Sequence, residues 1–155
     1  MTKTRNRLIS VGTGLLLFIA AVLFIIPQKT AGAETWIESA AEFAAGDGTQ
    51  GAPYQISSAG ELANLAKMVS GGETYESTYF ELTADIDLGG MSWYPIGDQG
   101  KNQVGFSGIF DGQGHTISNA VIATDDSKEG WYGTGLFGTS TCGVFRNFRL
   151  VNFTY

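Results

Sequence analysis

The spacing of apolar residues along the chain predicts one amphipathic helix. Four apolar residues recur at the interval of a single helix face and indicate a helix over about 58–70: Leu62, Leu65, Ala66 and Val69. Ser58 can cap this helix, and Glu61 stands three residues later, as a capping box requires. Gly71 and Gly72 end it. Because the helix has one apolar stripe, we expect it to lie against the end or side of a sheet.

Elsewhere the apolar positions indicate short strands separated by glycine-rich turns. A short amphipathic lead-in with Trp36, Ile37 and Phe43 comes before the first of them. The expected strands are 53–57, 79–88 with a bend near Ala84, 106–110 and 116–122, and residues 93–97 form a further apolar segment. Polar loops are expected at 98–105 and 123–134. This pattern predicts an all-β chain.

Two later blocks of the chain resemble two earlier ones. Gly108-Ile109-Phe110 is followed 27 residues later by Gly135-Leu136-Phe137, and the segment around Asn119 is followed 28 residues later by the segment around Asn147. A period of this length is typical of repeat architectures. The pattern predicts the coils of a parallel β-helix, with equivalent asparagines forming a ladder through their side-chain amides.

The amino-terminal residues have the composition of a secretory signal peptide. Three cations (Lys3, Arg5 and Arg7) precede an apolar run from Leu8 to Ile26, and Ala31-Gly32-Ala33 supplies small residues at a cleavage site. We expect cleavage between Ala33 and Glu34; an uncleaved membrane anchor is the alternative. The expected organisation is a signal peptide at 1–33, an amino-terminal cap at 34–78 and coils at 79–155.

Removal of the signal peptide leaves an acidic protein. Residues 34–155 keep five cations against all fifteen acidic residues of the chain, a net charge of −10. This balance argues against nucleic-acid binding, which needs clustered Lys and Arg. The single cysteine, Cys142, excludes an internal disulfide and is expected to be a small buried side chain; pairing with another molecule is the alternative.

Five separate strings together resemble the amino-terminal part of bacterial surface proteins that carry the GLUG motif. In chain order they are Gly46-Asp47-Gly48-Thr49 with Pro53-Tyr54-Gln55-Ile56, the capped helix ending at Gly71-Gly72, Leu82 to Leu88, Phe106 to Ile117, and Gly135-Leu136-Phe137-Gly138. The resemblance covers residues 43–155. It implies a right-handed parallel β-helix with the helix as its amino-terminal cap, exported to the cell surface. Such regions occur in large adhesin-like proteins and in some secreted proteases that cleave host immunoglobulin.

Candidate catalytic and metal-binding residues are few. His115, the only histidine, has Ser107, Asp111 and Ser118 near it in sequence, but the surrounding glycines favour a structural turn. Asp85, Asp87 and Asp111 could gather around calcium, as in a polysaccharide lyase, although no basic residue accompanies them. We therefore expect no catalytic residues, no metal and no cofactor.

The aromatic residues Trp93, Tyr94, Trp131 and Tyr132 fall at or beside the two polar loops, where they could stack on sugars. Packing over the ends of the coils is the competing interpretation.

Together these features predict a non-catalytic, secreted or cell-surface module for display or adhesion. Its expected partners are a host or cell-wall glycan or protein and further coils of the same protein, with membrane contact only through the signal segment. The alternatives are a polysaccharide lyase or hydrolase on the same scaffold and the amino-terminal region of a secreted protease. Because Val151 to Tyr155 alternates like a strand that begins another coil, we expect a longer protein.

Overall fold

Helix α1 (Ala59–Ser70) begins where the sequence predicts, because its end groups are satisfied by nearby side chains. The computed structural model describes residues 36–97, 105–122 and 135–154, all within the unit Ala31–Tyr155. The Ser58 hydroxyl accepts a hydrogen bond from the Glu61 N–H at 3.2 Å, which confirms the predicted cap. At the other end, Gly72 has φ +112°, and the N–H groups of Gly72 and Glu73 donate to Val69 and Met68, which closes the last turn.

Glu61 departs from the predicted capping box. Its carboxylate accepts hydrogen bonds from the N–H and hydroxyl of Ser57, from the Ser58 hydroxyl and from the Ala44 N–H. The box would have required a bond to the Ser58 N–H. Glu61 is buried, so these bonds tie α1 to the segments that precede it.

The rest of the described chain is mostly short parallel strands, as expected of an all-β protein. Before α1 come a 3₁₀ turn, η1 (Trp36–Ser39), and strand β1 (Tyr54–Ile56). The later strands are β2 (Tyr79–Leu82), β3 (Ile86–Asp87), β4 (Ser92–Trp93), β5 (Ile109–Asp111), β6 (Thr116–Ser118), β7 (Val121–Ile122), β8 (Val144–Arg146) and β9 (Arg149–Val151). The bend predicted near Ala84 separates β2 from β3.

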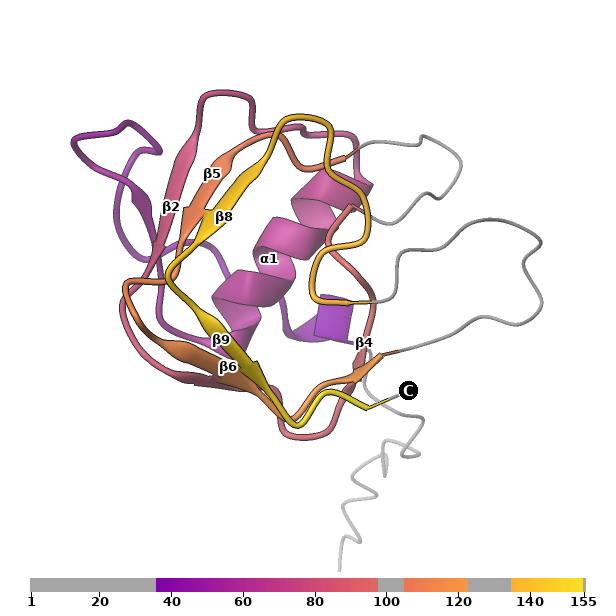
Figure 1. Ribbon diagram of the computed structural model, residues 1–155. Helices are drawn as coiled ribbons and strands as arrows, with labels where there is room; N and C mark the ends of the chain where they lie inside the picture. Colours follow the sequence, from indigo (N-terminus) through magenta and orange to yellow (C-terminus); the bar gives the residue numbers. More distant parts are fainter. Residues whose placement is uncertain (1–35, 98–104, 123–134, 155) are drawn as a thin grey trace, which may run out of the picture. The chain divides into compact units, whose positions relative to one another are not determined.

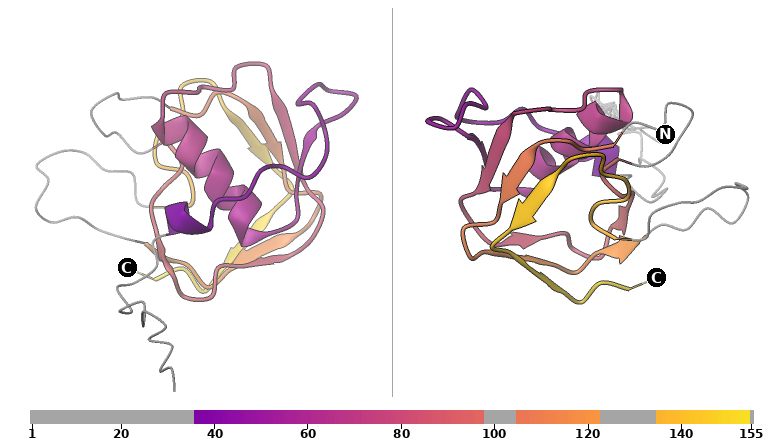
Figure 2. Two further views of the ribbon diagram at one scale, coloured as in Figure 1. Left: turned by 180° about the vertical axis from the view of Figure 1, so that it is seen from behind. Right: turned by 45° about the horizontal axis from the view of Figure 1, so that its top comes forward.

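The strands form three parallel sheets with the orders β1-β2-β5-β8, β3-β6-β9 and β4-β7. Each passage of the chain around the molecule therefore adds a strand to one sheet after another, and Figure 1 shows these strands lying over one another. Helix α1 lies across the end of the stack opposite β8 and β9, as the view from behind in Figure 2 makes plain. The apolar face predicted for α1 is buried there.

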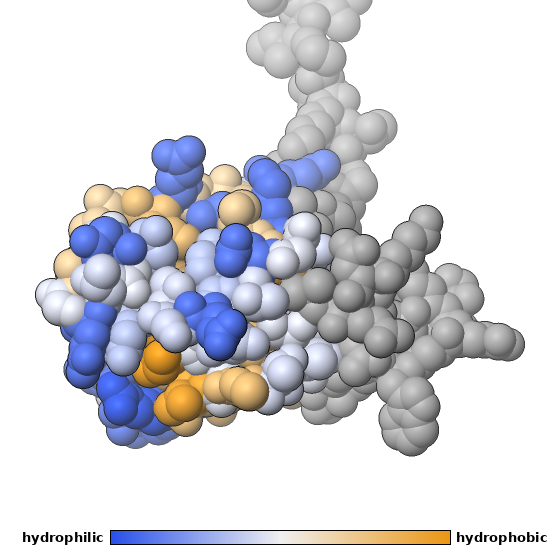
Figure 3. All heavy atoms as spheres, turned by 90° about the horizontal axis from the view of Figure 1, so that it is seen from above, coloured by the Kyte–Doolittle hydropathy of each residue, from blue (hydrophilic) through white to orange (hydrophobic). Residues whose placement is uncertain are grey.

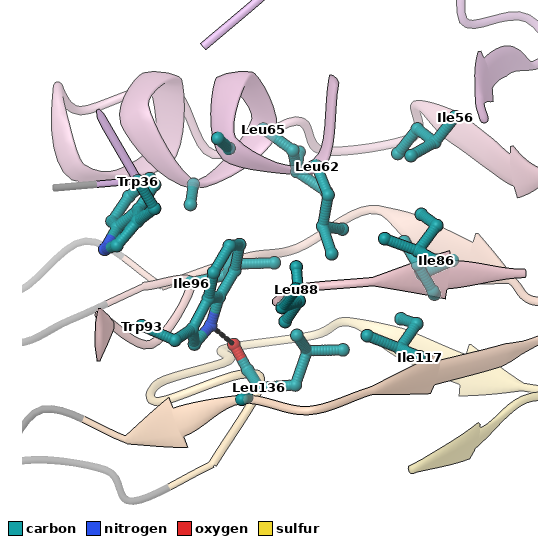
Figure 4. Close-up of a cluster of buried hydrophobic side chains, with 14 of the residues drawn as sticks. Trp36, Ile56, Leu62, Leu65, Ile86, Leu88, Trp93, Ile96, Ile117 and Leu136 are labelled. Atoms are coloured by element: carbon teal, nitrogen blue, oxygen red, sulfur yellow. Dashed lines mark hydrogen bonds between the residues drawn. The ribbon is translucent and has the colours of Figure 1, made fainter. Parts of the chain in front are cut away.

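Inward-facing side chains of successive strands stack in register and make the core. Phe80 lies opposite Phe110, which lies opposite Phe145, and Ile86, Ile117 and Leu150 form a second row. Near α1 the core is closed by Trp36 and Trp93, whose ring centroids are 4.9 Å apart (Figure 4). The buried side chains among these form one continuous hydrophobic core.

The repeat predicted from the sequence has the wrong register. Ile109 and Phe110 pair with Val144 and Phe145, whereas Phe137 forms a bridge with Ile96. Gly135-Leu136-Phe137 is therefore not the counterpart of Gly108-Ile109-Phe110. Asn119 likewise stacks on Asn152, 33 residues away, and Asn147 belongs to a different corner. The two matched blocks share a local conformation, since Asn119 and Asn147 both have φ +58°.

No helix among the described residues is long and apolar enough to cross a membrane. The predicted signal peptide, its cleavage site at Ala33 and Glu34, and the loop predicted at 123–134 lie outside those residues.

Candidate functional site

The outer face of the four-stranded sheet presents one polar row beside one apolar row. Because side chains alternate along a strand, Gln55, Glu81, Asp111 and Arg146 form the polar row. Tyr79, Ile109 and Val144 form the apolar row. A shallow groove of about 230 Å³ runs between these rows and the loop that contains Gln50 and Pro53.

Asp111 is the buried charge of this face. Its carboxylate accepts hydrogen bonds from Arg146 Nε at 2.7 Å, from Asn147 Nδ2 at 3.0 Å and from the Gln113 N–H at 3.0 Å. Burial disfavours the charged form, but the bonds from Gln113, Asn147 and Arg146 outweigh it and hold the pKa of Asp111 below its usual value. Asp111 therefore stabilises the turn that follows β5 and β8, and both of its carboxylate oxygens already accept hydrogen bonds there.

A second polar corner follows β3, β6 and β9. Asn119 Nδ2 donates to Asp87 Oδ1 at 2.8 Å, and Asn152 Nδ2 donates to Asn119 Oδ1 at 3.1 Å. A ladder of side-chain amides thus exists, as the sequence suggested, but its members are Asn119 and Asn152. Asn119 is half-buried, and Asn152 is exposed.

His115 lies at the other end of these strands, directly before β6, where its ring contacts the exposed Asp85 directly before β3. Its Nδ1 is 3.0 Å from Asp85 Oδ1, and the same oxygen accepts the Thr116 N–H at 2.9 Å. The bonds from Thr116 and His115 lower the pKa of Asp85. These contacts join the segment directly before β3 to the segment directly before β6.

The three aspartates considered as calcium ligands do not come together. Asp85 binds His115 and Thr116, Asp87 binds Gly89 and Asn119, and Asp111 binds Arg146. In the part of the chain that the structure describes, no three His, Cys, Asp or Glu side chains are grouped as metal ligands would be.

The sugar-stacking prediction is wrong for Trp93, which is 1% exposed. Its ring packs on Trp36, and its Nε1 donates to the Leu136 carbonyl at 3.2 Å (Figure 4). Tyr94 is half-buried near Trp36. Trp131 and Tyr132 lie outside the described residues. Trp93 is thus a packing residue of the core.

The segment Gly135-Leu136-Phe137-Gly138 is a packing element. Leu136 is buried, and its carbonyl accepts the Ile96 N–H at 2.9 Å, while the Gly138 N–H donates to Ile96. A side chain at Gly138 would meet Pro95 at 2.9 Å. The glycine therefore lets this segment lie directly on the segment below it.

Cys142 is exposed, contrary to the prediction that it would be buried. It sits in the turn before β8, where Ser140 accepts the Gly143 N–H. The apolar neighbours in the sequence suggested a strand, but the strand begins two residues later.

A cavity that the sequence did not reveal lies at the helix end of the stack. It measures about 310 Å³ and is lined by Glu42, Phe43, Tyr54, Asn64, Met68 and Tyr75. These residues come from four separate segments, so no local pattern links them. Phe43 and Tyr54 stack with centroids 4.9 Å apart, and Tyr75 meets Phe80 edge-on at 5.0 Å.

Comparison with known proteins finds two similar segments in much longer chains. A 117-residue stretch is 36% identical to halomucin of Haloquadratum walsbyi and covers 69% of this chain but 1% of halomucin. A 110-residue stretch is 36% identical to a protein of Evansella cellulosilytica whose name describes it as a Gly-rich membrane protein, covering 70% of this chain and 12% of that protein. No protein-family model matches the chain. No solved structure matches it either.

Proposed function

We propose that residues 34–155 are the amino-terminal cap and first coils of a right-handed parallel β-helix, exported to the cell surface for display or adhesion. In this proposal α1 is the cap, and the three sheets are the faces of the coils. The right-handed sense comes from the resemblance to GLUG-motif surface proteins.

The observation that supports this proposal best is the in-register stacking of successive passages of the chain. Phe80, Phe110 and Phe145 occupy one inward row, while Asp87, Asn119 and Asn152 occupy one corner. An architecture of this kind is extended by further equivalent passages of the chain, which we call levels. Each level has an outer surface that faces solvent. Such growth suits a protein that holds a binding surface away from the cell.

The similar proteins give independent support for a surface or membrane-associated location. One is named halomucin and the other a Gly-rich membrane protein, and this chain spans only 1% and 12% of their lengths. A segment of this size fits the role of one module within a long extracellular polypeptide. The apolar run of residues 8–26 is then a secretion signal.

We further propose that the module is not an enzyme. Among the described residues, three of the groups considered as acid, base or metal ligand are engaged in structural hydrogen bonds: Asp111 with Arg146 and Asn147, and Asp85 with His115 and Thr116. The polysaccharide lyase or hydrolase and the secreted protease remain the rival functions for the full-length protein.

Surface labelling of intact cells that produce the full-length protein tests the proposal. Antibodies against residues 36–97 are expected to label unpermeabilised cells, and the exported protein is expected to begin at Glu34 by amino-terminal sequencing. Label that appears only after permeabilisation would overturn the surface location. A purified sample that depolymerises a polysaccharide or peptide panel, and stops doing so after His115→Ala, would overturn the non-enzymatic role.

A further inference from the structure

The cavity at the helix end combines ring surfaces with hydrogen-bonding groups. Three of its lining residues are aromatic (Phe43, Tyr54 and Tyr75), and Met68, 42% exposed, extends their apolar surface. Glu42 and Asn64 supply an exposed carboxylate and an amide at the same cavity. The cavity is open to solvent, and its volume of about 310 Å³ lies at the lower end of the range of small-ligand sites.

One of these aromatic residues, Tyr75, has an unfavourable backbone conformation. Tyr75 has φ +57°, in the left-handed region that a bulky side chain rarely adopts. The surrounding contacts maintain it: the Tyr75 carbonyl accepts the Thr78 N–H at 3.0 Å, and the ring meets Phe80 edge-on. Retained strain of this kind is found preferentially at ligand sites, and here it places an aromatic residue at the cavity.

The phenol of Tyr75 stays neutral and can both donate and accept hydrogen bonds. Burial raises its pKa to about 12, with Glu73 and Tyr54 adding to the effect. The cavity therefore offers phenol, amide and carboxylate groups beside a ring surface, a combination suited to a ligand that carries many hydroxyl groups on an apolar ring.

The arrangement of the rings and the charge around the cavity disfavour two classes of ligand, cations and acids. A quaternary ammonium needs several ring faces directed at one centre. Here Phe43 and Tyr54 are turned toward one another at an interplanar angle of 30°. An acidic ligand is disfavoured because residues 34–155 have a net charge of −10 and Glu42 lies at the cavity. A neutral sugar needs no cage of converging ring faces and is not repelled by the negative charge.

We propose that the cavity between α1, β1 and the loop at Tyr75 binds a neutral hexose unit of a glycan. The sugar ring lies against the aromatic and Met68 surface, and its hydroxyls bond to Glu42, Asn64 and Tyr75. This inference rests on the proposed adhesive function and names its ligand class.

Binding of the full-length exported protein to an array of neutral and sialylated oligosaccharides tests the inference. Binding to neutral oligosaccharides above the level of the sialylated ones is expected. Phe43→Leu, which removes a ring but keeps an apolar side chain, is expected to weaken binding about tenfold. Glu42→Gln and Tyr75→Phe are expected to weaken it severalfold, since each removes a hydrogen-bonding group and little volume.

Lys67→Ala is the matched control, because Lys67 is exposed on α1 next to Met68 but does not line the cavity. It is expected to leave binding unchanged, and all variants are compared only if their melting temperatures stay near that of the wild type. The inference is overturned if no neutral sugar binds, or if binding survives Phe43→Leu and Glu42→Gln combined. Surface labelling of the same cells reports separately on display, so a lost glycan site with retained labelling rejects this inference alone.

Discussion

At the scale of single residues, the corners of the chain depend on a few side chains that tolerate positive φ. Asn119, Asn147 and Asn152 lie at φ +58°, +58° and +55°. Asparagine adopts this conformation more readily than most residues with a side chain. Its amide also reaches the neighbouring level, where Asn119 joins Asp87 to Asn152. One residue type therefore provides both the turn and the connection between levels.

Two substitutions of Asn119 separate these contributions. Asn119→Ala loses the amide bonds and places alanine at positive φ, so we expect it to lower the free energy of unfolding by about 2 kcal/mol. Asn119→Gly loses the same bonds without the backbone strain and is expected to cost about 1 kcal/mol. Urea unfolding measures both. Equal costs for the two variants would show that backbone conformation contributes nothing at this corner.

Asp111 gives the stability of the protein a predictable dependence on pH. Its folded-state pKa is lowered, so its stabilising effect is complete above the unfolded value of about 3.9 and is lost as the pH falls through the folded value. Asp111→Asn is expected to cost about 2 kcal/mol at pH 7, because bonds to a charged group are weakened. Its unfolding free energy should also fall less steeply between pH 5 and pH 2 than that of the wild type. Parallel pH profiles would contradict the assigned role.

At the scale of elements, the sequence predicted which segments are helix or strand better than it predicted which strands pair and in which register. The stripe from Leu62 to Val69 and the alternation from Tyr79 to Leu88 depend on local periodicity, and both elements exist. The register depends instead on which residues meet across levels. Loops of different length intervene, so Asn119 meets Asn152 after 33 residues, whereas Asp111 meets Asn147 after 36. A comparison at one fixed offset could not find both pairs.

The candidate site was missed for the same reason. Phe43, Tyr54 and Tyr75 belong to separate segments of the sequence, and the folded chain brings them to one cavity. Trp93 and Tyr94 were predicted to stack on sugars because they are close to a loop, yet Trp93 packs inward against Trp36. Proximity to a loop does not determine the face of a strand on which a ring lies.

Docking of α1 is testable by three substitutions on the same helix. Leu65→Ala should cost about 2–5 kcal/mol because Leu65 is fully buried in the hydrophobic core. Ser58→Ala should cost about 1 kcal/mol through loss of the cap. Met68→Ala, at an exposed position, is expected to change stability by about 0.5 kcal/mol or less. Negligible effects of all three in urea melts would show that the helix is not docked.

At the scale of the whole molecule, the two ends of the stack differ in character. Helix α1 covers one end, whereas β8 and β9 lie last in their sheet orders, and their outer edges pair with no described strand. Val144, Leu150 and Val151 are 47%, 45% and 43% exposed there. In the view of Figure 3 strongly hydrophobic residues reach the surface next to hydrophilic ones. Leu150 belongs to the inward row of Ile86 and Ile117, so an interior position is open to solvent at this level.

This uncovered level predicts how residues 34–155 behave when they are produced alone. Unpaired strand edges and exposed apolar side chains favour pairing with another chain. We therefore expect this fragment to sediment as dimers or larger species, with marginal stability. Val144→Lys combined with Val151→Lys should shift it toward the monomer, because charged residues at an edge oppose pairing. Met68→Lys places one such charge at the helix end and should leave association unchanged. A wild-type fragment that sediments as a compact monomer and melts cooperatively would show that the level formed by β8 and β9 needs no further partner.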